Sequence, residues 1–185
     1  MNPKNEQRLI VVIVDDEEAM CHGAQRVLKS YSVDINDINT RVSFDAKFVS
    51  KGKDFLELLE KEKVDLVLLD YKLPDISGLD LLEHIVSKNI DAMAIMITAY
   101  ATFETAVQAT KLGANDFIAK PFTPEELRSS IRKATINLLL ARHARQSEED
   151  KKRVKEFGVV DYLIKSNVSI MEIVLKIKEF LDIKK

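Results

Sequence analysis

Short apolar runs alternate along this chain with segments whose apolar residues recur at helical spacing. The apolar runs lie at residues 9–14, 64–69, 92–97 and 117–119. Such near-continuous hydrophobicity is typical of parallel strands that helices cover on both faces. The segments of helical period lie at residues 17–29, 54–61 and 79–87. Strand and helix thus follow each other in turn, which predicts a doubly wound α/β sheet.

Two further segments complete the predicted architecture. Residues 41–50 alternate partly between apolar and polar, so we expect a second strand there, at the sheet edge, after a long connection over residues 31–40. The run TPEE at residues 123–126 predicts a helix start, because it combines a capping hydroxyl, an early proline and acids in the first turn. No glycine or proline follows before Gly158, so this last helix is expected to be long.

The far half of this last helix carries apolar residues that need a partner. Beyond about residue 135, a helix has nothing of a small domain left to cover. The apolar residues of this part are Ile136, Leu138, Leu139 and Leu140. We therefore expect the chain to self-associate through this helix.

Composition narrows the class of protein. With 185 residues, of which 46% are hydrophobic, the chain can bury one full core and an appendage. The net charge of -2 gives no basic field for nucleic acid. The single cysteine, Cys21, cannot form an internal disulfide, and the polar residues 1–8 lack the apolar core of a signal peptide. Because the apolar runs are also too short to cross a membrane, a cytoplasmic protein is expected.

Polar side chains stand where the apolar runs stop. Asp15 and Asp16 follow the first run, Asp70 follows the second, Thr98 follows the third, and Lys120 follows the last. The carboxyl ends of parallel strands meet in one crevice, so these residues should meet there. Carboxylates, a hydroxyl and an ammonium together indicate a magnesium-assisted phosphoryl site. Taken singly, an acidic pair is as well explained by helix capping, and a strand-end threonine or lysine is usually structural.

The same residues carry a resemblance to a known family. The ordered motifs are VDDE at 14–17, LD at 69–70, LPDISG at 73–78, ITAY at 97–100 and KPF at 120–122. Together they resemble the receiver domain of two-component response regulators, over roughly residues 9–134. The resemblance implies a flavodoxin-like five-stranded parallel sheet in the order 2-1-3-4-5. It also implies phosphorylation on Asp70 by a histidine kinase or phosphotransfer protein, with Mg²⁺ as the cofactor.

The resemblance also implies roles for individual residues. Asp16 and Asp70 would bind Mg²⁺ directly together with the backbone carbonyl of Lys72, and Asp15 would reach the metal through water. Tyr100 would lie where receivers tune the lifetime of the acyl phosphate, and we expect it to lengthen that lifetime.

Signal output would follow from the same resemblance. Thr98 and Lys120 would hold the phosphoryl group, and their movement would switch Phe117 between outward and inward rotamers. Residues 98–122 look especially like receivers of the nitrogen-regulator type, which usually precede a sigma-54 ATPase. No phosphate-binding glycine loop follows here, so we expect the output to come from the receiver and its tail.

The tail contains an internal repeat. Residues 112–120, LGANDFIAK, return as FGVVDYLIK at residues 157–165. The repeat lacks a second acidic pair and phosphoacceptor, so it resembles only the end of another receiver. We therefore divide the chain into three parts. They are a receiver domain at residues 8–134, a helical linker at 135–156 and a strand-helix tail at 157–185.

Three function classes remain in competition. A response regulator that signals through protein association, including a homodimer through the long helix or tail, fits the complete set of site residues. A pseudo-receiver scaffold would act without phosphorylation and would not need that set. A phosphatase with Asp70 as nucleophile would need a general base, and none is evident. We therefore expect a phosphoacceptor with slow self-dephosphorylation rather than an enzyme.

Overall fold

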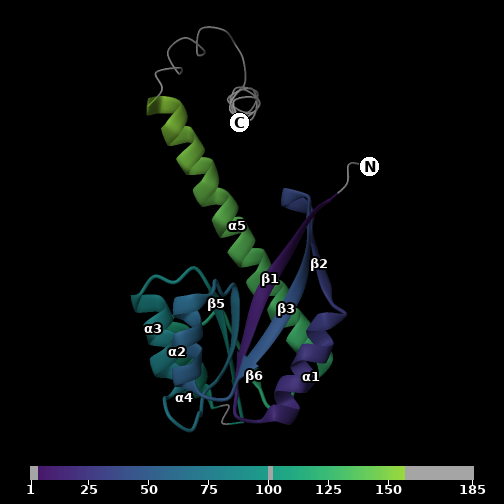
Figure 1. Ribbon diagram of the computed structural model, residues 1–185, viewed down its shortest axis with the longest axis vertical. Helices are drawn as coiled ribbons and strands as arrows, with labels where there is room; N and C mark the ends of the chain where they lie inside the picture. Colours follow the sequence, from purple (N-terminus) through teal and green to yellow (C-terminus); the bar gives the residue numbers. More distant parts are fainter. Residues whose placement is uncertain (1–3, 100–101, 157–185) are drawn as a thin grey trace. The chain divides into compact units, whose positions relative to one another are not determined.

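The computed structural model describes residues 4–99 and 102–156 (Figure 1). Tyr100 and the predicted strand-helix tail at residues 157–185 lie outside the described residues, so the expectations placed on them stay predictions. The chain divides into two compact units, residues 1–139 and 140–185, and the boundary falls within the last helix. In the described part of the chain, no helix is both long enough and apolar enough to span a bilayer.

The first unit alternates strands and helices, as the sequence pattern predicts. The strands are β1 (Asn5–Val14), β2 (Ser32–Ile35), β3 (Thr40–Val49), β4 (Leu66–Asp70), β5 (Met93–Thr98) and β6 (Asp116–Ala119). The helices are α1 (Glu18–Lys29), α2 (Gly52–Lys61), α3 (Gly78–Ser87), α4 (Phe103–Lys111) and α5 (Pro124–Glu156), with a short 3-10 turn at Asn36–Ile38. The weakly apolar α4 is the one helix that periodicity alone does not single out.

The strands form one sheet in the order β2-β3-β1-β4-β5-β6. All neighbours pair in parallel except β2, which is antiparallel to β3. Without β2, the order is the flavodoxin-like one that the resemblance implies. The predicted number of five strands is wrong, because β2 makes a sixth. The predicted edge position of residues 41–50 is wrong for the same reason, since β3 lies between β1 and β2.

The extra strand comes from the segment interpreted as a long connection. Its sequence SVDI alternates polar and apolar residues, so that Val33 and Ile35 are buried while Ser32 is exposed. Alternation over four residues is too short a pattern to stand out from a loop. Asp34 adds ion pairs to Lys4 (3.1 Å) and Arg41 (3.2 Å), which tie β2 to its neighbours.

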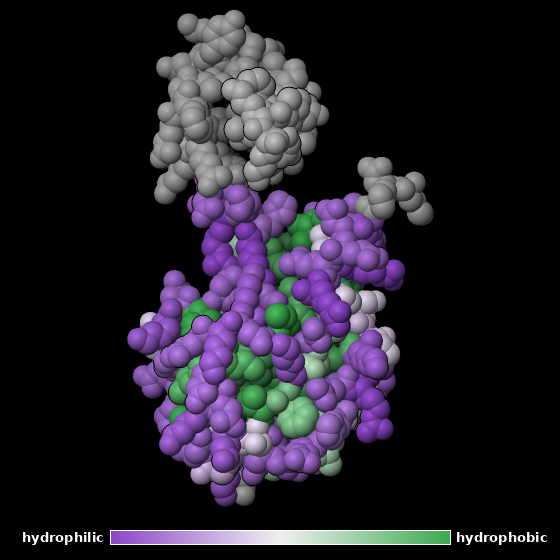
Figure 2. All heavy atoms as spheres, viewed as in Figure 1, coloured by the Kyte–Doolittle hydropathy of each residue, from purple (hydrophilic) through white to green (hydrophobic). Residues whose placement is uncertain are grey.

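Helices cover both faces of the sheet and create two hydrophobic clusters. In Figure 1, α2, α3 and α4 lie on one side of the strands, and α1 and the first part of α5 lie on the other. The cluster beneath α1 and α5 includes Leu9, Val11, Ile13, Leu28 and Ile131. On the face drawn in Figure 2, hydrophilic residues cover most of the described surface, and a group of hydrophobic residues lies near its middle.

The long strands β1 and β3 change the interpretation of the last helix. Leu138 and Leu139 are only 1% and 4% exposed, and they belong to the same cluster as Val33 and Ile35. Ile136 packs against that cluster as well. The expectation that these residues lack a partner in their own domain is therefore wrong, because the extended sheet covers them.

The start of α5 has the capping structure that the sequence predicts. At α5, the Glu126 amide donates to Thr123 Oγ1 (3.2 Å), and the Glu126 carboxylate accepts from the Thr123 amide (2.7 Å). These reciprocal bonds form a capping box. The hydrogen bonds from Thr123 also lower the pKa of Glu126.

Candidate functional site

Four neighbouring strands bring the candidate residues to one edge of the sheet. Asp15 directly follows β1, Asp70 ends β4, Thr98 ends β5 and Lys120 directly follows β6. Because β1, β4, β5 and β6 are adjacent and parallel, their carboxyl ends lie together. The structure thus gathers residues that are spread over more than a hundred positions of the sequence.

Lys120 lies at the centre of the site. Its Nζ is 2.7 Å from Asp15 Oδ2, 2.8 Å from Glu17 Oε1 and 3.0 Å from Asp70 Oδ2. Burial alone would lower the pKa of Lys120, but the contacts with these three carboxylates raise it above its usual value. The ammonium therefore stays charged and offsets one of the three negative charges around it.

Asp15 is the most deeply buried acid of the site. Its Oδ1 accepts a hydrogen bond from the Glu17 amide (2.9 Å), as an aspartate at a turn does when it bonds the backbone two residues on. Its Oδ2 lies close to Lys120 but outside good hydrogen-bond geometry, so that contact is mainly electrostatic. Burial raises the pKa of Asp15, although Lys120 and the Glu17 amide act against this effect.

The acidic cluster has a composition that suits a hard divalent cation. Asp15, Glu17 and Asp70 each place a carboxylate oxygen within 4.8 Å of the others. Three carboxylates and one ammonium leave two negative charges, which a divalent cation would neutralise. Carboxylate oxygens are also the ligands that Mg²⁺ prefers. The donor set therefore fits Mg²⁺.

Glu17 is the site residue that the sequence analysis did not assign. It is the third acid of the run Asp15-Asp16-Glu17-Glu18 and directly precedes α1, so its place in the run is the signal that could have identified it. Asp16 is exposed and lies outside this three-carboxylate group. Asp16 nevertheless lines a surface depression of about 360 Å³ that also contains Glu17 and Asp70. The residues that line this depression are Asp16, Glu17, Asp70, Lys72, Leu73, Pro74, Ala99 and Lys120.

The loop after Asp70 is held by close backbone contacts. The Lys72 amide donates to Asp70 Oδ1 (3.3 Å), and the Gly78 amide donates to the Tyr71 carbonyl (3.0 Å). A Cβ atom on Gly78 would lie 2.0 Å from the Asp70 carbonyl oxygen. Only glycine allows this approach, so the SG pair of the LPDISG motif fixes the backbone that carries Asp70.

Asp75 fastens the other side of this loop. Its two carboxylate oxygens accept hydrogen bonds from the amides of Gly52 (2.8 Å) and Lys53 (3.0 Å), at the start of α2. Desolvation acts to raise the pKa of Asp75, but the bonds from Lys53 and Gly52 outweigh it and lower the pKa. The Asp75 carboxylate thus joins the loop that follows Asp70 to the helix that precedes β4.

Thr98 and Phe117, the two residues of the predicted switch, lie on β5 and β6. Thr98 is fully buried, and its carbonyl accepts a hydrogen bond from the Lys120 amide (2.8 Å). Phe117 is half-buried and packs against the cluster beneath α2, α3 and α4. Both residues therefore lie on strands that end at the acidic site.

A buried thiol lies behind the acidic site. The Cys21 thiol is buried on α1 and donates to the Asp15 carbonyl at 3.5 Å. Burial raises its pKa to about 12, and the Asp15 carboxylate adds to this effect. Cys21 is therefore a protonated core residue.

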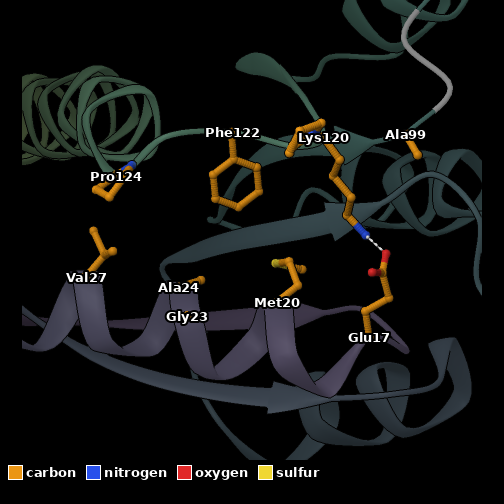
Figure 3. A pocket seen from close by; sticks show the side chains of 10 residues that line it. Glu17, Met20, Gly23, Ala24, Val27, Ala99, Lys120, Phe122 and Pro124 are labelled. Carbon is orange, nitrogen blue, oxygen red and sulfur yellow. Dashed lines mark hydrogen bonds and ion pairs between the residues drawn. The ribbon is translucent and has the colours of Figure 1, made fainter.

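An apolar groove of about 570 Å³ begins beside the acidic site. Figure 3 shows Met20, Ala24 and Val27 of α1 on one side, and Phe122 and Pro124 on the other. The Glu17 and Lys120 side chains, joined by their ion pair, close one end of the groove (Figure 3). A partner protein that fills this groove would therefore reach the acidic site.

Comparisons with known proteins agree with the geometry. Residues 11–132 match the family model described as response regulator receiver domain. The chain is 36% identical over 95 residues to the regulatory protein LuxO of Vibrio cholerae, covering 51% of this chain and 21% of that protein. It is 42% identical over 91 residues to the response regulator protein PilR of Pseudomonas aeruginosa, covering 49% and 20%. The chain thus spans about a fifth of the length of these relatives.

Solved structures show the same fold. The receiver domain of a LuxO repressor protein from Vibrio parahaemolyticus aligns with a TM-score of 0.67 and 28% identity, over 75% of this chain and 98% of that one. A CheY-like receiver domain from Methanospirillum hungatei aligns with a TM-score of 0.62 and 26% identity, over 73% and 99%.

Proposed function

Because this chain belongs to the response regulator receiver domain family, we propose that its Asp70 carboxylate accepts a phosphoryl group from a phosphohistidine of a partner protein. The observation that supports this most strongly is the arrangement at the sheet edge. Asp70 is buried beside Asp15 and Glu17, and the Lys120 ammonium contacts all three.

The proposed reaction is a single group transfer. A carboxylate oxygen of Asp70 attacks the phosphorus, the bond from phosphorus to the partner's imidazole nitrogen breaks, and an acyl phosphate forms on Asp70. The imidazole leaves with its electron pair. Lys120, already 3.0 Å from Asp70, is placed to pair with a phosphoryl oxygen, and the Thr98 hydroxyl is proposed to hold another.

Mg²⁺ is the proposed cofactor of this transfer. When bound, it would offset the charge of the acidic cluster and of the incoming phosphoryl group. We propose Asp16, Asp70 and the Lys72 carbonyl as its direct protein ligands, with Asp15 acting through water. The exposed position of Asp16 on the wall of the depression is compatible with this role. Glu17, the third carboxylate of the cluster, is an additional candidate for the water-mediated shell.

The acyl phosphate is proposed to decay slowly, so that the chain is a phosphoacceptor rather than an enzyme. Hydrolysis needs a group that takes a proton from the attacking water. Lys120 lies beside Asp70 and remains charged, so it cannot accept that proton. Signal output is proposed to pass from Thr98 and Lys120 to Phe117, on the strand that leads to Lys120.

The partner is proposed to dock in the apolar groove of Figure 3. A helix of a histidine kinase or phosphotransfer protein would place its phosphohistidine at the end of the groove closed by Lys120. A Met20→Lys variant should then slow transfer from a phosphohistidine protein and leave transfer from phosphoramidate unchanged. A Met20→Lys variant that keeps the rate of the unchanged chain with the phosphohistidine protein would rule out this docking site.

We also propose self-association through the last helix or the tail. The burial of Leu138 and Leu139 leaves Leu140, which is 37% exposed, as the apolar residue of that set that faces solvent. The receiver, linker and tail boundaries at residues 8–134, 135–156 and 157–185 are likewise kept as proposals.

Binding of beryllofluoride, a phosphoryl mimic, tests the site. We expect Mg²⁺-dependent binding to the full chain, which Asp70→Asn abolishes. The matched control is Asp65→Asn, because Asp65 flanks the opposite end of β4 with a similar exposure, 5% against 6%. Binding that survives Asp70→Asn, or that needs no Mg²⁺, would contradict the proposal.

A further inference from the structure

The first half of β1 leaves one edge of the sheet without a partner strand among the described residues. β1 pairs with β3 over its whole length, whereas β4 pairs with β1 only from Val11 to Val14. Asp65 extends this second pairing by one residue. Its amide donates to the Ile10 carbonyl (3.0 Å), and its carboxylate accepts from the Ile10 amide (2.8 Å). Before Ile10, the β4 side of β1 is open.

The strand register tells which backbone groups face this open edge. In a parallel sheet, each residue directs its N–H and C=O to one side, and the side alternates along the strand. The Asn5 amide donates to the Asn39 carbonyl on the β3 side, and Ile10 bonds on the β4 side. Glu6 and Arg8 lie an even number of positions before Ile10, so their N–H and C=O groups point to the same side, which is the open edge.

Such an edge is a template for another strand, because its donors and acceptors are already aligned. We propose that the β1 edge pairs antiparallel with the same edge of a second copy, about a two-fold axis at Gln7. Glu6 then lies opposite the partner's Arg8, and Arg8 lies opposite the partner's Glu6. Both residues direct their backbone groups to the edge, so this register forms hydrogen-bonded pairs on both sides of the axis.

Side-chain charge favours this register over its neighbours. Glu6 and Arg8 lie on the same face of the sheet, and both are exposed. Among the described side chains Glu6 has no ion pair, and the Arg8 pair with Asp45 is long, at 3.5 Å, with Arg8 68% exposed. An axis at Glu6 would place two glutamates opposite each other, and an axis at Arg8 would pair two arginines. Of these three axes, only the one at Gln7 places opposite charges together, and it does so twice.

The proposed interface is separate from the phosphoryl site. Glu6 and Arg8 lie in the first half of β1, and Asp15 follows its last residue. The inference therefore goes beyond the proposed function, and variants at this edge should leave phosphorylation intact. An interface of one short strand pair is small, so we expect weak association, visible by sedimentation at roughly 0.1–1 mM chain.

Charge reversal in the full-length chain tests the register. Glu6→Arg alone and Arg8→Glu alone each place like charges together twice in the homodimer, and each should weaken association about tenfold or more. An equimolar mixture of the two variants should associate again, because the first variant carries two arginines at these positions and the second carries two glutamates. The double variant E6R/R8E should associate like the unchanged chain. A monomeric unchanged chain, or single variants that associate normally, would overturn the proposal.

A backbone variant tests the edge independently of charge. Arg8→Pro removes the amide that faces the open edge and leaves the pairing with β3 untouched. We expect a folded monomer, with folding checked by circular dichroism and by Mg²⁺-dependent beryllofluoride binding. If Arg8→Pro fails to fold, the mixing experiment decides. Loss of association in Leu140→Lys, with association kept in Glu6→Arg, would assign the contact to α5 and overturn the proposal.

Discussion

Replacing Lys120 by methionine perturbs the site at its centre. Methionine has a similar length but no charge, so the substitution removes the cation and keeps the volume. The variant leaves three carboxylates without the ammonium that lies 2.7–3.0 Å from each of them. We expect lower stability without Mg²⁺ and stronger stabilisation by Mg²⁺.

The magnitude follows from burial. The Lys120, Asp15 and Asp70 side chains are 9%, 1% and 8% exposed, and removing one partner of a buried ion pair costs about 3–5 kcal/mol. The Glu17 contact adds roughly 0–1 kcal/mol, because that side chain is 63% exposed. Since a carboxyl group can also take up a proton, we expect the lower end, about 3 kcal/mol at pH 7.

Adding Mg²⁺ and lowering the pH should each restore part of the stability that Lys120→Met loses. Removing Lys120 raises the negative charge of the cluster, so Mg²⁺ should bind more tightly, and about 100 times its dissociation constant would restore about 2.7 kcal/mol. Burial already raises the pKa of Asp15 above its unfolded value of 3.8. A raised acid pKa means that stability falls as pH rises through the folded pKa. The deficit of the variant should therefore shrink as the pH is lowered below 7.

Urea unfolding with and without Mg²⁺ measures these effects. The matched control is Lys133→Met, because Lys133 contacts Asp116 at 3.4 Å and is 63% exposed, and it should change stability by less than about 1 kcal/mol. Equal stability losses in the two variants, or equal Mg²⁺ stabilisation of Lys120→Met and the unchanged chain, would refute the electrostatic account of the site.

The remaining predictions concern the loop that carries Asp70. Gly78→Ala should destabilise the fold by about 1–3 kcal/mol and slow phosphorylation, because its Cβ overlaps the Asp70 carbonyl. Gly23→Ala, where a Cβ meets nothing within 4 Å, should instead stabilise by about 0.5–1 kcal/mol in the same unfolding assay. Asp75→Ala should cost about 1 kcal/mol above pH 4, since two amides at the start of α2 lose their acceptor. Because the pKa of Asp75 is lowered from 3.8, this difference should disappear as the pH falls through the folded pKa, and a difference that persists there would contradict the assignment.

Most of the parallel core was predictable from sequence because β4, nearly all of β5 and the end of β1 are buried on both faces. Burial on both faces leaves a continuous apolar run, such as residues 66–69, which is recognisable without any tertiary information. β2 was not predictable in this way. Its four residues alternate too briefly, and its role depends on Leu138, more than a hundred residues away, which it helps to bury.

The sequence predicted which residues meet at the candidate site but not which contacts they make there. Strand ends in a parallel sheet converge, so Asp15, Asp70 and Lys120 could be placed together from the pattern alone. Which acid contacts Lys120 depends on the turn after β1, where the Glu17 amide bonds Asp15 and brings the Glu17 side chain towards Lys120. No sequence spacing specifies that turn.

Phosphoryl incorporation from phosphoramidate tests the central claim most directly. This donor carries a phosphorus–nitrogen bond like that of phosphohistidine, and the modified residue can be located by borohydride reduction followed by mass spectrometry. The account predicts one phosphoryl group per chain, located on Asp70, which forms with Mg²⁺ and does not form when Mg²⁺ is chelated beforehand. Incorporation at another residue, or none on a folded chain that contains Mg²⁺, would contradict it.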